Sequence, residues 1–179
     1  MARFRAGASG DYALTAAIDG NEIAADPDLT NNSDTESTSV TPWLTHTVGS
    51  TDFSPFGMAV DSGGSVHFAW VYYGKLMYAT NASGRWLSWA LADSGQVTSA
   101  DVAVDGADNI HIAYGDNYAS LKYIHNTDGT WSDPQTVSDT AGTAWALSMA
   151  VGSDDSVHMT FLTCGPACTS SLFYATNQD

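Results

Sequence analysis

The sequence has 179 residues, of which 44% are hydrophobic and 11% aromatic, so most of the chain is expected to fold around a core. Its formal charge is −15, with 20 acidic residues against five lysines and arginines. Because Lys and Arg provide most of the attraction to phosphate backbones and anionic lipids, nucleic acid and anionic membranes are excluded as expected partners. No apolar run approaches the length of a membrane span, so no membrane insertion is expected.

Residues 1–40 differ from the rest and are expected to form a hairpin followed by a polar linker. The segment "GDYALTAAIDGNEIAA" predicts a hairpin that turns at residues 19–21. The next segment, "DPDLTNNSDTESTS", is typical of a linker, and the spacing of its acidic residues does not match a calcium loop. The N-terminus lacks the apolar segment of a signal peptide, so either a signal was removed or the sequence is a piece of a longer chain. Strand-like sequence directly after the initial Met favours the piece of a longer chain.

Residues 56–92 contain four short segments that predict antiparallel strands. These are "FGMAVD", "SVHFAW", "KLMYAT" and "RWLSWALA". They are rich in β-branched and aromatic residues, and Gly, Asp, Ser and Asn lie in the turns between them. Helical periodicity is absent throughout, so the sequence predicts an all-β fold.

The same pattern occurs three times in residues 41–179. The segments "MAVDSGGSVHFAW", "VAVDGADNIHIAY" and "MAVGSDDSVHMTF" align, and their histidines, His67, His111 and His158, lie 44 and then 47 residues apart. Short strands repeated at such a period are typical of propellers. We therefore predict that residues 41–179 form a β-propeller-type array of three four-stranded blades.

The third repeat ends after its third strand, "LFYATNQD", whereas a fourth-strand pattern, "TPWLTHTVGST", precedes the first repeat. This arrangement predicts that the N-terminal strand completes the last blade. Closed propellers have typically about four to eight blades. We therefore predict self-association by strand exchange between residues 43–48 of one chain and 172–176 of another, which gives either a ring of about six blades or a filament. The alternative is that the chain is a truncated fragment of a longer propeller and does not assemble in this way.

The segments "AVDSGGSVHFAW", "LMYATN" and "GRW" resemble the repeats of secreted bacterial propeller proteins of sialidase-like type, over residues 41–177. Such repeats occur in carbohydrate-binding modules, polysaccharide-processing enzymes and cell-surface proteins, so the resemblance implies an extracellular or cell-surface location. The Asp-box S-x-D-x-G-x-T-W is not matched, because "TNASGRW" and "HNTDGTW" keep the Gly and Trp but change the spacing. The arginine cluster of a sialidase is also missing, since Arg85 is the single arginine of the repeats.

Two cysteines, Cys164 and Cys168, flank a Gly-Pro pair in the extended loop of the third repeat. This spacing suits a disulfide-closed loop. The alternative is half of a metal site, but no second Cys pair or nearby His completes it. We expect a disulfide, which indicates an oxidising compartment.

The repeated histidines are interpreted as packing or turn-satisfying groups, because equivalent positions around a ring do not converge on one zinc ion or one substrate. The aromatic residues that follow the repeat are expected to lie in the core between blades: Tyr78, Tyr123 and Tyr174, with Trp43, Trp86 and Trp131. No catalytic residue, metal ligand or cofactor is predicted.

Residues that break the repeat are better candidates for a binding site. The loops expected on one propeller face carry Tyr and Trp next to Asp and Asn, which suits sugar binding by ring stacking and polar contacts. The alternative is that these are ordinary variable loops. The expected ligand-binding residues are Tyr72, Tyr73, Asp116, Asn117, Tyr118 and Trp145.

The sequence thus favours a non-catalytic extracellular module that binds a glycan or a cell-surface polysaccharide through these loops. Two alternatives stay open. One is a propeller-type polysaccharide lyase or glycosidase, since 20 acidic residues are available for a catalytic pair. The other is a structural protein that assembles into rings or filaments.

Overall fold

The computed structural model describes residues 10–17, 33–40, 44–51, 56–92, 96–116, 120–139, 143–164 and 170–178. The chain divides into two compact units, residues 1–46 and 47–179. All regular elements in the described ranges are β-strands, which confirms the predicted all-β fold. None of the described residues belongs to a helix with the length and apolarity needed to cross a membrane.

The first unit contains one hairpin, in which β1 (Gly10–Ala17) pairs with β2 (Ser33–Val40). A hairpin was expected here, but its second strand was expected directly after residue 21. The linker prediction is therefore wrong for residues 33–40. Thr35 and Thr38 are β-branched and suit a strand, and pairing with β1 gives the backbone of this polar segment its hydrogen-bond partners.

The second unit contains three antiparallel sheets, each of which follows the chain order of its strands. The first sheet consists of β3 (Phe56–Val60), β4 (Val66–Tyr72), β5 (Lys75–Thr80) and β6 (Leu87–Ala92). The middle sheet consists of β7 (Ser99–Val104), β8 (Ile110–Asp116), β9 (Ser120–Thr127), β10 (Thr130–Trp131) and β11 (Gln135–Ser138). The third sheet consists of β12 (Thr143–Val151), β13 (Val157–Cys164) and β14 (Ser170–Thr176).

The outer strands differ between the sheets. In the middle sheet β10 and β11 both pair with β9 and together occupy the place that β6 has in the first sheet. The third sheet has three strands within the described residues, and residues 44–51 form no strand in the single chain. Part of that segment instead contacts β4, where Trp70 Nε1 donates to the Ser50 carbonyl at 2.8 Å. Strand exchange between residues 43–48 and 172–176 concerns two chains and stays a prediction.

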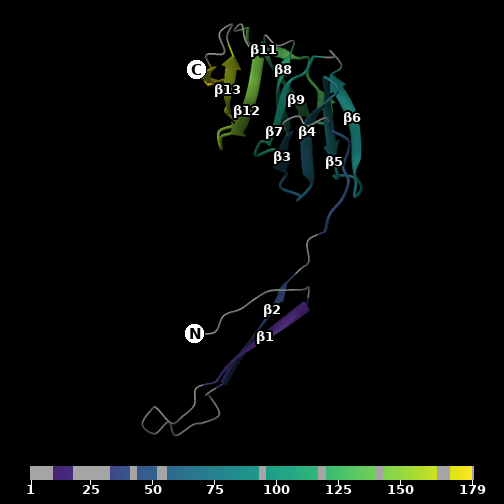
Figure 1. Cartoon of the computed structure of the whole chain (residues 1–179), viewed down its shortest axis with the longest axis vertical. Helices are drawn as coiled ribbons and strands as arrows, with labels where there is room; N and C mark the ends of the chain where they lie inside the picture. Colours follow the sequence, from purple (N-terminus) through teal and green to yellow (C-terminus); the bar gives the residue numbers. More distant parts are fainter. Residues whose placement is uncertain are drawn as a thin grey trace. The chain divides into compact units, whose positions relative to one another are not determined.

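The first strands of the three sheets lie next to one another, because β7 contacts both β3 and β12 (Figure 1). Gly57 lets β3 approach β7 closely, since a Cβ there would clash with the Asp101 side chain and lie 2.6 Å from the Val102 nitrogen. Asp101 also joins β7 to β12, because its Oδ2 accepts from the Met149 nitrogen at 2.7 Å. These adjacent first strands are the inner strands of the array.

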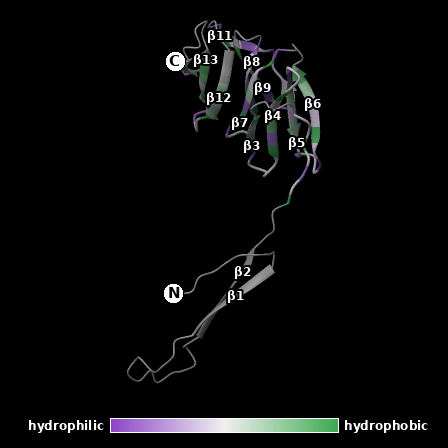
Figure 2. Ribbon diagram, viewed as in Figure 1, coloured by the Kyte–Doolittle hydropathy of each residue, from purple (hydrophilic) through white to green (hydrophobic). Residues whose placement is uncertain are grey.

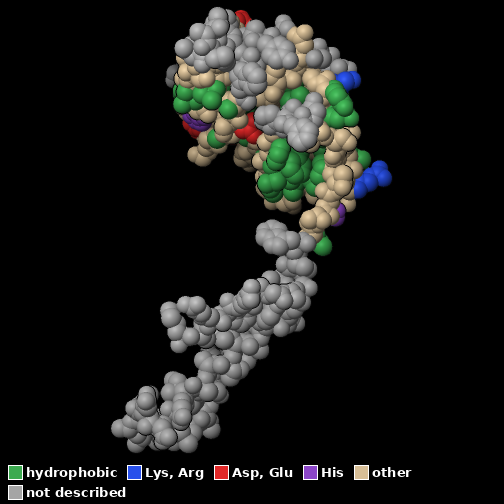
Figure 3. All heavy atoms as spheres, in the orientation of Figure 1, with side chains coloured by type: hydrophobic (Ala, Val, Ile, Leu, Met, Phe, Trp, Pro, Cys, Tyr) green, Lys and Arg blue, Asp and Glu red, His purple; other side chains and the backbone are tan. Residues whose placement is uncertain are grey.

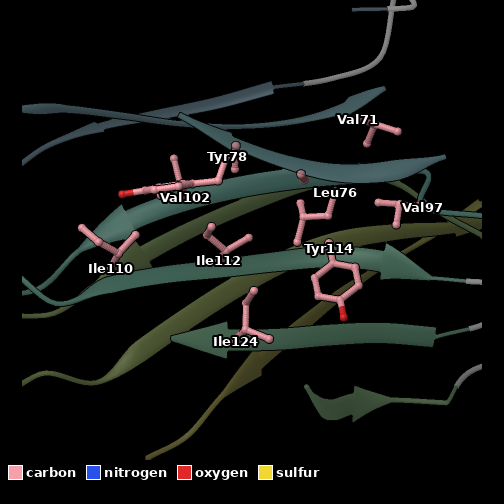
Figure 4. Close-up of a cluster of buried hydrophobic side chains, with 11 residues drawn as sticks. Val71, Leu76, Tyr78, Val97, Val102, Ile110, Ile112, Tyr114 and Ile124 are labelled. Carbon is pink, nitrogen blue, oxygen red and sulfur yellow. The ribbon is translucent and has the colours of Figure 1, made fainter. Parts of the chain in front are cut away.

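Two hydrophobic clusters fill the spaces between the sheets. The first joins Leu76 and Tyr78 of the first sheet to Val102 and Ile112 of the middle sheet, and Figure 4 shows these side chains interleaved. The second joins the other face of the middle sheet to the third sheet. Figure 2 shows hydrophobic residues along β3, β4 and β5. The middle sheet therefore packs one face on the first sheet and the other face on the third sheet.

The turns that join the first two strands of each sheet share one geometry. They span residues 61–65, 105–109 and 152–156, and in each the first and fifth residues are linked by a backbone hydrogen bond. The fourth residue has a positive φ of 82° at Gly64, 63° at Asp108 and 62° at Asp155. Gly and Asp are among the residues that adopt this conformation most readily, so the repeated turn chemistry follows from the sequence.

Candidate functional site

The repeated histidines lie in hydrogen-bonded chains inside their own sheets. His67 Nδ1 lies 2.6 Å from the Tyr78 hydroxyl, and its Nε2 lies 3.2 Å from Asp61 Oδ2. In the middle sheet, His111 has the corresponding contacts to Tyr123 at 2.7 Å and to Asp105 at 3.2 Å. The hydroxyl can donate to Nδ1 while the Nε2 proton goes to the carboxylate, so each chain is satisfied with one proton on the ring.

The third sheet contains a longer version of this chain. His158 Nδ1 lies 2.7 Å from the Tyr174 hydroxyl, and Nε2 lies 2.8 Å from Ser156 Oγ, which donates to Asp154 Oδ1 at 2.6 Å. A serine and a displaced aspartate thus replace the single aspartate of the other two sheets, because Gly152 occupies the corresponding position. The histidines serve separate sheets, and no group of described residues could hold a metal ion.

Burial and hydrogen bonding perturb the groups in these chains. Burial raises the pKa of Tyr78 and of Tyr123 to about 12, so both hydroxyls stay protonated and can donate. The Ser65 backbone bond is the largest influence that lowers the pKa of Asp61, and the Ser156 hydroxyl is the largest for Asp154. Desolvation acts to raise the pKa of Asp105, but hydrogen bonds from Asn109, His111 and Ala107 outweigh it and lower the pKa.

These shifts predict a loss of stability in acid. A carboxylate whose folded pKa lies below its ordinary value of 3.8 stabilises the fold above that pH, and this contribution is lost as pH falls through the folded pKa. Burial raises the pKa of Asp101, and this has the opposite effect on stability. Its contribution to the stability of the fold is present at low pH and is lost as the pH rises above 3.8. We expect the temperature of the unfolding midpoint to decrease as the pH is lowered from about 4 to about 2. In the Asp105→Asn variant this temperature is expected to decrease less steeply over the same range. An unchanged slope for Asp105→Asn would contradict a role for this carboxylate.

A cavity of about 130 Å³ lies between the middle and third sheets. Its lining combines buried apolar side chains with uncharged polar ones near solvent. The lining residues are Tyr123, Gln135, Val137, Val157, Met159, Ala175, Thr176 and Asn177. Pockets that enclose a drug-sized ligand have about 300–1,000 Å³, so this cavity has room for part of a ligand, such as one edge of a sugar ring.

The cavity lies where the repeat is broken. Trp89 pairs opposite Tyr78 in the first sheet, whereas Gln135 pairs opposite Tyr123 in the middle sheet. The rings of Trp89 and Trp131 each lie 5.1 Å from the Tyr78 ring, and Trp131 packs against the cluster between the first and middle sheets. Gln135 therefore lines the cavity at the position where the first sheet has a tryptophan.

The polar groups around the cavity are amides and hydroxyls. Asn177 accepts from the Val157 nitrogen through Oδ1 at 2.7 Å, which fixes the amide plane and leaves its amino group as a donor. Gln135 is exposed, and no described residue provides a hydrogen-bond partner for its side chain. Among the described lining residues none is acidic or basic. The arrangement is therefore suited to fixing hydroxyl groups.

The structure places the sequence-predicted residues Tyr72, Tyr73 and Asp116 at the opposite end of the strands from this cavity. Tyr72 and Asp116 end β4 and β8, and the segment before β7 links these ends, because Val97 N donates to Gly74 O at 2.9 Å and Thr98 N donates to Gly115 O at 3.1 Å. The rings of Tyr72 and Tyr73 meet edge to face at 4.6 Å. Tyr73 is 70% exposed.

The other sequence-predicted residues lie wholly or partly outside the described part of the chain. Asn117, Tyr118 and Cys168 are outside it, and the side chains of Trp145 and Cys164 are also not described, so the disulfide stays a prediction. The position of Trp145 in the backbone differs from the predicted one. Trp145 was expected in a loop but lies within β12, where the register shifts between Ala144 and Leu147.

The residues that line the cavity were not predicted from the sequence. Aligning "GRWLSWALA" with "GTWSDPQTV" sets Trp89 against Pro134, whereas the strand pairing sets Trp89 against Gln135. One extra residue between Trp131 and Gln135 hides the replacement of tryptophan by glutamine. The detectable signal was the loss of the second tryptophan from the fourth strand of the middle sheet.

The chain matches no family model and no curated protein. It is similar to the crystal structure of AofleA from Arthrobotrys oligospora, with 13% identity and a TM-score of 0.56 over 80% of this chain and 43% of that one. A mutant of AofleA with three arginines replaced by alanine gives 14% identity and a TM-score of 0.58 over 83% of this chain and 48% of that one. This chain thus spans less than half the length of those structures.

A fucose lectin from Kordia zhangzhouensis, solved with methyl-fucoside, matches with 14% identity and a TM-score of 0.48 over 69% of this chain and 94% of that one. Neither AofleA structure is named as a sialidase, so these two similarities support the resemblance seen in the sequence only at the level of the fold. At this identity, the AofleA structures show that the chain has the fold predicted from its repeat, an all-β array of the propeller type.

Proposed function

We propose that this protein is a non-catalytic carbohydrate-binding module that takes part of a neutral sugar into the cavity between the middle and third sheets. The observation that carries the proposal is the replacement of Trp89 by Gln135 at equivalent positions, with a cavity at the second position. Residues that only fill space tend to repeat, whereas a site departs from the repeat. We also propose an extracellular or cell-surface location.

The lining favours neutral sugars over charged ones. Val137, Met159 and Ala175 offer apolar surface to the C–H groups of a sugar ring, and the amides of Gln135 and Asn177 can bond its hydroxyls. The described lining residues include no cation, and the formal charge of the chain is −15, so uronic acids and sialic acids are disfavoured. The absence of acidic side chains among these lining residues favours binding without hydrolysis or elimination.

Gln135→Trp is the test of this site. The substitution restores the side chain that the first sheet has at this position, so it is expected to fill the cavity and preserve the fold. Binding to neutral glycans on an array, followed by calorimetry with the best one, is expected to weaken by about tenfold or more. Trp89→Gln is the matched control, because it changes the same position in the first sheet and leaves the cavity untouched.

Tyr73→Ala tests the loops predicted from the sequence. If glycan binding falls with Tyr73→Ala and persists with Gln135→Trp, the binding site lies at the loop end near Tyr72 and Asp116, and the cavity is not the site. If the protein releases products from a polysaccharide panel, the non-catalytic assignment is wrong.

A further inference from the structure

Two hydrophobic residues of the third sheet are exposed, although the equivalent residues of the other sheets are more buried. Leu76, Leu121 and Leu172 occupy the same position in β5, β9 and β14, and they are 0%, 1% and 73% exposed. Tyr174 is 62% exposed, whereas its equivalent Tyr78 is 4% exposed. The first two leucines are buried by the sheet that follows them. The successor face of the third sheet, defined here by Leu172 and Tyr174, has no such cover among the described residues.

The opposite difference occurs at the first sheet. Met58, Val102 and Met149 are equivalent, and they are 59%, 3% and 8% exposed. Phe56 and Val60, on either side of Met58, are 71% and 54% exposed. These three residues define the predecessor face of the first sheet. Figure 3 shows hydrophobic side chains gathered at the place of β3, with a smaller group beside β13.

Within the chain, a successor face always meets a predecessor face. Leu76 and Val102 lie in one hydrophobic cluster, and Leu121 and Met149 lie in the other. By the same register, Leu172 is the missing partner of Met58. The two uncovered faces are therefore complementary to each other, and contacts between two identical faces have no counterpart inside the chain.

We propose that a second copy of this chain covers both faces: the successor face of each protomer packs on the predecessor face of the other. This contact continues the interfaces already present within the chain and repeats their rotation. Two chains then place six sheets in one ring, within the range of about four to eight blades typical of closed propellers. The contact joins sheet faces and does not require the strand exchange between residues 43–48 and 172–176.

Charge favours these faces for self-association. The five side chains that define them are uncharged, although the chain as a whole has a formal charge of −15. Two such chains repel one another at long range, and salt screens that repulsion. The association is therefore expected to strengthen as salt is added, as befits an apolar contact between acidic molecules.

The test measures the mass of the full chain by analytical ultracentrifugation. The wild-type chain is expected to be a dimer, and Met58→Glu and Leu172→Glu are each expected to be folded monomers. Both positions are exposed in the single chain, so the variants should keep the β circular dichroism spectrum. Met58→Gln and Leu172→Gln are milder replacements if either glutamate variant misfolds. Leu87→Glu is the matched control, because Leu87 is a 40% exposed residue of β6 outside both faces.

Mixing the two variants distinguishes this contact from other dimers. Met58→Glu keeps a good successor face, and Leu172→Glu keeps a good predecessor face, so an equimolar mixture is expected to form a weaker dimer with one interface. A monomeric wild type, or a dimer that survives either single variant, overturns the proposal. A mixture that stays monomeric overturns it as well.

Discussion

Replacing Leu76 by alanine is expected to lower the free energy of unfolding by about 2–5 kcal/mol. The side chain is fully buried between the first and middle sheets, and Figure 4 shows it within that cluster. Removing it deletes apolar contact and leaves a cavity that strands pinned in two sheets can close only in part. Urea unfolding followed by tryptophan fluorescence measures the change.

The same substitution at Leu172 is the matched control. In dilute, monomeric protein Leu172→Ala is expected to change stability by less than about 0.5 kcal/mol, because the side chain is 73% exposed. At concentrations where chains associate, Leu172→Ala should instead lower the midpoint, since that contact then buries the residue. Equal losses for Leu76→Ala and Leu172→Ala in the dilute protein would contradict the assignment of buried and uncovered faces.

Replacing Asp101 by alanine is expected to cost about 2–4 kcal/mol, because the carboxylate joins the inner strands of the sheets. Its Oδ2 accepts from the Met149 nitrogen at 2.7 Å and its Oδ1 from the Val102 nitrogen at 2.9 Å. Without the side chain the Met149 N–H loses its partner, and the space against Gly57 is left unfilled.

Asp101→Asn separates the hydrogen bond from the charge. The amide oxygen can still accept from the Met149 nitrogen, so this variant should lose less stability than alanine. Exposed Asp133 provides the control, and Asp133→Ala is expected to stay within about 0.5 kcal/mol of the wild type in chemical unfolding. If Asp101→Ala and Asp133→Ala have the same free energy of unfolding, the hydrogen bond between β7 and β12 contributes nothing measurable to stability.

The strands of the second unit could be predicted because each repeat contains the same local signals. The alternation around His67 and the turn residues before it recur at His111 and His158, and the structure has a strand pair at each position. The left-handed residues of these turns are Gly or Asp in all three repeats, so local conformation and sequence agree.

Other features depend on interactions that one-dimensional patterns do not contain. The strand Ser33–Val40 is polar and has the composition of a linker, and its strand character comes from pairing with β1. The exposure of Tyr174 depends on the absence of a following sheet within the described chain, whereas its repeat position predicts burial.

The candidate cavity was hidden for a related reason. It depends on which residue of β11 lies opposite Tyr123, and one extra residue between Trp131 and β11 shifts that pairing from Pro134 to Gln135. Alignment of the letters cannot show such a shift, whereas the hydrogen-bonded register does. The position of Tyr72, Tyr73 and Asp116 at or next to the ends of strands could be predicted from the sequence, because the repeat shows where these strands end.

The middle sheet is packed on both faces, and all residues of β8 except Asp116 are buried. The first and third sheets each have only one neighbour within the described chain, so they form an array with nearest-neighbour coupling. In the single chain, local unfolding is therefore expected to start at the first or third sheet. Once one of these sheets has unfolded, the middle sheet has only one packed face left. The central strands are the last to exchange their amide protons, and a closed ring would remove this gradient because every sheet would have two neighbours.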